Sequence, residues 1–156
     1  MFDKILVPTD GSVMAENAVA PALEIAKRFG AKLRVVAVLE SRRLAADFDA
    51  TALYEAAAYR TFAAEVDRQA RSAVERMAGP SRSAGVETST AVRQGAPAAE
   101  IVAEAKEWGA QLIVLSTHGH TGVTGILFGG VARRVIHDAP CPVLTCRPEA
   151  APRRRT

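Results

Sequence analysis

The chain has 156 residues, of which 49% are apolar, and its mean hydropathy of +0.06 is close to neutral. This length is typical of one domain, and the composition excludes a disordered chain, which would be poor in apolar residues. No apolar run approaches the roughly 20 residues that span a bilayer. The first residues, Met1–Pro8, lack the basic and apolar parts of a secretory signal. We therefore expect a cytoplasmic protein without a membrane segment.

The net charge of +3 comes mainly from the end of the chain. Leaving out Arg153–Arg155 and Glu149 reduces it to +1, so the body has no basic excess that would favour nucleic acid. We expect one domain over 1–147 and a basic, disordered tail over 148–156. The tail could contact RNA or acidic lipid, but a frayed, solubilising end is the favoured interpretation.

The first third of the chain alternates between strand-like and helical patterns. The run Ile5–Val7 predicts a short strand that ends at Pro8. Apolar residues with helical spacing predict a helix over 15–29, which Gly30 ends. Pro21 lies inside this stretch, so we expect a kink there or two short pieces.

The middle of the chain predicts a strand over 33–39, a loop or irregular insertion over 40–51, and a long helix over 53–77. Gly79 and Pro80 are expected to end this helix. Its apolar residues at helical spacing are expected to form a buried stripe, with charged residues on the other faces. The stripe consists of Phe62, Val66, Ala70, Ala73 and Met77.

The last part of the chain predicts, in order, a strand over 86–92, a helix from Pro97, a strand over 112–115, a helix over 130–138 and a strand over 142–146. Strands joined by helices form parallel sheets with right-handed crossovers. The fold class is therefore α/β, a doubly wound three-layer sandwich with a five-stranded parallel sheet. Cys141 and Cys146, an odd number of residues apart, would point to opposite faces of the last strand and are expected to stay reduced.

Two loops carry residue types suited to a ligand. Residues 8–12 follow the first strand and residues 116–122 follow the fourth, and in such sheets ligands bind beyond the carboxyl ends of the strands. Asp10 is a candidate ligand residue, with helix capping as the alternative. His118 and His120 lack further metal ligands in the sequence, so turn roles are favoured over a metal site.

These residues resemble the universal stress protein family from the first residues to about Arg147. The resemblance rests on the opening ILVPTDGS, on LIVLSTHG after the third helix, and on the closing APCPVL. The family's phosphate loop has glycine, two residues, glycine, nine residues, glycine, then serine or threonine. This chain keeps the spacing with Ser116, Gly119, Gly129 and Gly130, where Ser116 replaces the first glycine and Gly130 the final hydroxyl residue.

The resemblance implies strand order 3-2-1-4-5 and a site for ATP or another adenine nucleotide, with Mg²⁺ as an optional companion. It places the backbone of Val38 at the adenine and Asp10 near the adenosine. The remaining site residues that it implies are Pro8, Thr9, Ser116, His118, Gly119, Gly129, Gly130 and Val131.

The resemblance also implies a homodimer built on the last strand and a role in regulating the stress response. A dimeric interaction protein that does not bind nucleotide is the second interpretation. A slow ATP-hydrolysing enzyme ranks lowest, because the sequence offers no general base.

Overall fold

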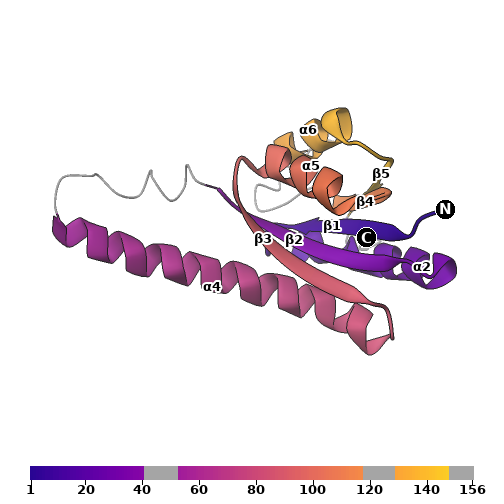
Figure 1. Ribbon diagram of the computed structural model, residues 1–156, viewed down its shortest axis with the longest axis horizontal. Coiled ribbons are helices and arrows are strands. Elements are labelled where there is room, and N and C mark those ends of the chain that lie inside the picture. Colours follow the sequence, from indigo (N-terminus) through magenta and orange to yellow (C-terminus); the bar gives the residue numbers. More distant parts are fainter. Residues whose placement is uncertain (41–52, 118–128, 148–156) are drawn as a thin grey trace, which may run out of the picture.

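The computed structural model describes residues 1–40, 53–117 and 129–147, which form a three-layer α/β fold around a parallel sheet (Figure 1). The sheet has five strands in the order β3-β2-β1-β4-β5, which confirms the expected fold class and strand order. The strands are β1 (Lys4–Thr9), β2 (Lys32–Glu40), β3 (Thr88–Gly95), β4 (Leu112–Ser116) and β5 (Val143–Cys146). The expected tail over 148–156 and nearly all of the expected loop over 40–51 lie outside the described residues.

Helices cover both faces of the sheet. They are α1 (Val13–Glu16), α2 (Val19–Phe29), α4 (Leu53–Ser83), α5 (Pro97–Trp108) and α6 (Gly130–Asp138). Alternate residues of β1 enter two separate cores because strand side chains alternate between faces. Ile5 and Val7 pack in the core beneath α2 and α4, and Leu6 packs in the core beneath α5 and α6. Figure 1 shows these two helical layers on opposite sides of the strands.

The strand order reverses at β1, which pairs with both β2 and β4. Since all strands are parallel, the loops after β1 and β4 emerge at the same edge of the sheet. This edge is the switch point at which doubly wound folds bind ligands.

The first strand continues through Pro8, where the sequence predicted its end. The Lys4 carbonyl accepts a hydrogen bond from the Gln111 amide at 2.9 Å, so Lys4, Leu6 and Pro8 direct their backbone groups toward β4. The register with β4 stops at Leu6, whereas the register with β2 continues to Thr9. The ladder with β4 therefore ends where Pro8 has no amide hydrogen to donate.

The predicted helix over 15–29 consists of two pieces, but the break lies at Asn17 and Ala18. Pro21 is the third residue of α2. Proline is tolerated in the first turn because amides there have no acceptor within the helix.

The prediction that Gly79 and Pro80 end the long helix is wrong, since α4 continues to Ser83. Ala78 is fully buried and Ser81 is 1% exposed, so the last turns of α4 pack tightly against the rest of the fold. This packing offsets the local cost of proline near the end of a helix.

The predicted buried stripe of α4 is wrong in its first half. Met77 and Ala73 are buried, Val66 and Ala70 are half-buried, and the Phe62 side chain is exposed. The helix has 31 residues, about 46 Å, whereas β1 spans only about 20 Å. As Figure 1 shows, the first part of α4 extends past the sheet. No helix among the described residues is both long enough and apolar enough to cross a membrane.

Candidate functional site

A groove of about 830 Å³ opens where β1, β2 and β4 end. Its walls are the β1–α1 loop, the last residues of β2 and β4, the start of α6, and one face of α4. Pockets for small molecules have volumes of about 300–1,000 Å³. The groove therefore lies at the switch point of the sheet and has room for a ligand of nucleotide size.

Eight of the ten residues that the sequence placed in a site line this one groove. They are Pro8, Thr9, Asp10, Val38, Ser116, Gly129, Gly130 and Val131. The other two, His118 and Gly119, lie outside the described residues. Three separate parts of the sequence thus meet, because the carboxyl ends of parallel strands share one edge.

The loop after β1 is held by its own side chains. The Thr9 hydroxyl accepts a hydrogen bond from the Gly11 amide at 3.0 Å, and the Asp10 carboxylate accepts one from the Ser12 amide at 3.0 Å. Gly11 has φ of +79°, which a side chain would strain. Ser12 is the N-cap of α1, so Asp10 does not cap this helix and its exposed carboxylate lines the groove.

The start of α6 forms a second wall. The Gly129 amide donates to the Thr117 carbonyl at 2.9 Å, and the first amide that bonds back along α6 is that of Arg133. The amides of Gly130 and Val131 precede this bond, at the positive end of the helix dipole. Helix starts of this kind favour anions such as phosphate.

The wall that α4 provides was not predicted from the sequence. Residues of α4 that line the groove include Phe62, Val66, Gln69, Ala73 and Arg76. The helical spacing of Phe62, Val66 and Ala73 predicted that these three residues belong to the core, whereas no prediction singled out Gln69 or Arg76. The predicted length of this helix could have indicated the wall, because a helix much longer than the strands beside it cannot bury its whole apolar face against them.

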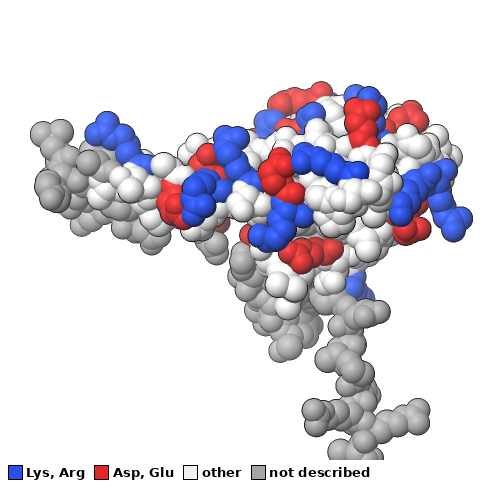
Figure 2. Space-filling model, turned by 90° about the horizontal axis from the view of Figure 1, so that it is seen from below, with Lys and Arg blue, Asp and Glu red and all other residues white. Residues whose placement is uncertain are grey.

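Charged side chains of both signs line the groove. Asp10 and Glu40 are acidic, and Arg68 and Arg76 are basic. Arg68 donates two hydrogen bonds to Glu65, at 2.9 and 2.6 Å, and these lower the pKa of Glu65 to about 2. On the face seen in Figure 2, basic and acidic side chains are interspersed and form no patch of one sign.

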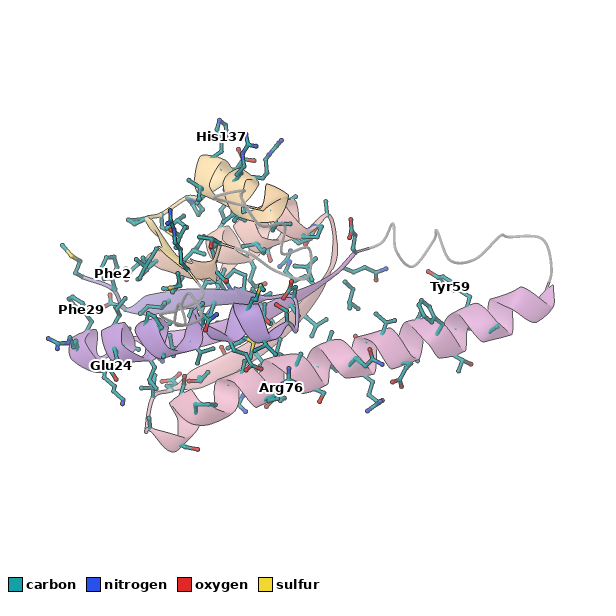
Figure 3. All side chains as sticks on the ribbon, turned by 180° about the vertical axis from the view of Figure 1, so that it is seen from behind. Phe2, Glu24, Phe29, Tyr59, Arg76 and His137 are labelled. Carbon is teal, nitrogen blue, oxygen red and sulfur yellow. The ribbon has the colours of Figure 1, made fainter. Side chains whose placement is uncertain are left out.

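Neither cysteine nor His137 is among the residues that line the groove. Cys146 packs against the core beneath α2, and Cys141 against the core beneath α5 and α6, which confirms the prediction of opposite faces. Burial raises the pKa of both thiols, which disfavours a nucleophilic role. The His137 ring pairs with Asp138 at the end of α6 and points away from the body of the protein (Figure 3).

The fold and the groove together define a doubly wound α/β protein with a candidate ligand site at the switch point of its sheet. The model of the universal stress protein family matches residues 1–147, and the chain belongs to this family. It is 33% identical over 147 residues to universal stress protein MJ0531 of Methanocaldococcus jannaschii, with 94% of this chain and 83% of that protein covered.

Solved structures share the fold at 24% sequence identity. The hypothetical protein MJ0577 has a TM-score of 0.83, with 97% of this chain and 99% of that chain covered. A universal stress protein in complex with cAMP has a TM-score of 0.63, with 94% and 97% covered. The universal stress protein from Archaeoglobus fulgidus in complex with dAMP has a TM-score of 0.66, with 94% and 98% covered.

Proposed function

We propose that this protein binds an adenine nucleotide, ATP or a related one, in the groove at the switch point. The observation that carries the proposal is the convergence of the β1–α1 loop, the end of β2 and the start of α6 on one space of about 830 Å³. Two universal stress proteins of the same fold, in complex with cAMP and with dAMP, support the choice of an adenine nucleotide.

The walls of the groove suit the three parts of a nucleotide. The base would lie against the backbone of Val38, where β2 provides an apolar surface. Asp10, on the loop after β1, would face the ribose. The amides of Gly130 and Val131 would receive the phosphates at the start of α6, as would Gly119 and His118 of the phosphate loop. Asp10 and Glu40 are the groove carboxylates from which Mg²⁺ could draw a ligand.

The function that follows is regulation by ligand binding in the cytoplasm during the stress response, without catalysis by the protein itself. We further infer a homodimer that forms through β5. This strand lies at the edge of the sheet and pairs only with β4 among the described residues. Unpaired edge strands favour pairing with a second chain.

Titration calorimetry of the purified protein with AMP, ATP, cAMP and GMP tests the proposal. We expect saturable binding of adenine nucleotides, and Gly129→Val should weaken it at least about tenfold by placing a branched side chain beside the phosphates. The variant should still fold, because Gly129 has φ of −64° and an added Cβ would meet the Thr117 carbonyl at 3.6 Å, an ordinary contact.

The thermal unfolding midpoint of Gly129→Val, measured alongside, checks that it folds. A folded variant with the affinity of the wild type would exclude the start of α6 as the phosphate site. A wild-type protein that binds no adenine nucleotide would favour the second interpretation, an interaction protein that does not bind nucleotide.

A further inference from the structure

We infer that Arg76 of α4 is a ligand-contacting residue of this groove and binds a phosphate group, so that α4 selects phosphorylated ligands over the bare nucleoside. The inference rests on the proposed nucleotide site and extends it to the wall that sequence motifs do not mark. Arg76 lies on the face of α4 that lines the groove with Ala73 and Gln69, where α4 passes the body of the fold (Figure 3).

Arg76 contacts the loop after β1 and the end of α1. Its Nη2 lies 3.5 Å from the Gly11 carbonyl oxygen, and its Nε lies 3.3 Å from a carboxylate oxygen of Glu16 on α1. Gly11 follows Asp10, whose carboxylate also lines the groove. The guanidinium therefore lies beside the loop that would face the ribose.

The partners of Arg76 hold it only loosely. The side chains of Arg76 and Glu16 are 56% and 43% exposed, and ion pairs between exposed side chains contribute little to stability. Arg68, the other arginine of the groove, is instead engaged by two short hydrogen bonds to Glu65 on its own helix. The contacts of Arg76, at 3.3 and 3.5 Å, are longer, so Arg76 can exchange its partner at low cost.

Phosphate is the group that would make this exchange favourable. A guanidinium presents parallel N–H donors that match two oxygens of a phosphate, and such charge-assisted pairs are stronger than neutral hydrogen bonds. Glu16 is then the competing anion, since its carboxylate occupies the same donor while no phosphate is bound. Removing the charge of Glu16 should therefore strengthen binding, whereas removing that of Arg76 should weaken it.

The experiment compares the dissociation constants of adenosine, AMP and ATP for the wild type and four variants by calorimetry. We expect Arg76→Gln to weaken AMP and ATP about tenfold and to change adenosine by less than about twofold. Arg76→Lys should be intermediate, and Glu16→Gln should tighten AMP binding. Arg71→Gln is the matched control, because Arg71 lies on α4 outside the groove and pairs with Asp67 at 2.7 Å.

The outcomes separate this inference from the proposed function. Wild-type protein that binds adenine nucleotides while Arg76→Gln keeps its AMP affinity overturns the inference alone. Equal losses for adenosine and AMP also overturn it, because they indicate a structural role. If Arg76 only tied α4 to α1, then Glu16→Gln would weaken binding as well. A wild type that binds none of the three ligands overturns both proposals.

Discussion

At the scale of single residues, the two glycines at the start of α6 have different roles. The amide of Gly129 donates to the Thr117 carbonyl. Gly129 therefore contributes to the groove through the space that its missing side chain leaves. Gly130 is exposed, and a Cβ added there would have no other atom within 4 Å. It is also the position where the family's phosphate loop has serine or threonine. Gly130 can therefore accept a side chain without steric conflict.

We expect Gly130→Ser to tighten ATP binding more than AMP binding. The new hydroxyl would donate to a charged phosphate oxygen, a contribution of at most about 1.5–3 kcal/mol. Replacing this glycine should also raise the free energy of unfolding by up to about 1 kcal/mol, because serine restricts the unfolded chain more than glycine does. Calorimetry with both nucleotides and urea denaturation measure the two effects. Equal gains for ATP and AMP would argue against a contact with the terminal phosphates.

At the scale of elements, a cluster of charges ties the edge strand β3 to α5. Arg93 donates to carboxylate oxygens of Glu100 at 2.8 Å, Glu104 at 2.8 Å and Glu107 at 2.7 Å. Glu104 is only 5% exposed and also accepts a hydrogen bond from Arg34 at 2.8 Å. The Arg93 guanidinium is thus shared by three carboxylates along one face of α5 and, together with Arg34, reduces their mutual repulsion.

Arg93→Met should lower the free energy of unfolding at pH 7 by about 2–3 kcal/mol, because it removes a cation that three carboxylates share, although Arg34 still bonds to the buried Glu104. Hydrogen bonds from Arg93 lower the pKa of Glu107 below its ordinary 4.5. The stabilisation is therefore complete above that pH and is lost as the pH falls through the lowered value.

Urea denaturation at several pH values checks this prediction. The deficit of Arg93→Met should shrink as the pH falls from the ordinary 4.5 through the lowered pKa of Glu107, because this carboxylate then becomes protonated. The control is Glu107→Gln, whose side chain is 64% exposed and which should lower the free energy of unfolding at pH 7 much less than Arg93→Met does. A deficit that does not depend on pH would show that Arg93 acts through packing alone.

At the scale of the whole molecule, the direction of the backbone groups in β5 decides which of its residues could pair with a second chain. The carbonyls of Pro142 and Cys146 accept hydrogen bonds from Ile113 and Thr117, each at 3.0 Å. Backbone amides and carbonyls alternate in direction along a strand. Those of Leu144 therefore also point toward β4, while those of Val143 and Thr145 point outward. A second copy of the chain that pairs with β5 would therefore bond to Val143 and Thr145.

We expect Thr145→Pro to convert a homodimer to a monomer that remains folded, since it removes an outward donor and leaves the ladder with β4 intact. Leu144→Pro is the contrasting variant, because it removes a donor to β4 and should lower the unfolding temperature. Light scattering at micromolar concentration and thermal unfolding distinguish the two. A wild type that runs as a clean monomer would contradict the proposed dimer.

The sequence by itself determined the order of strands and helices, since alternating and helical spacings of apolar residues are local properties. It also determined the residue types at the ends of β1 and β4, and these meet in the groove because parallel strands end at one edge. Only the tertiary structure decided which backbone groups and side chains each residue contacts. It placed Pro8 where the ladder with β4 ends, and it kept Pro80 inside α4 because the buried last turns of this helix offset the lost hydrogen bond. It also placed the stripe from Phe62 to Ala73 in a wall of the groove, because α4 is longer than the strands and extends past the sheet.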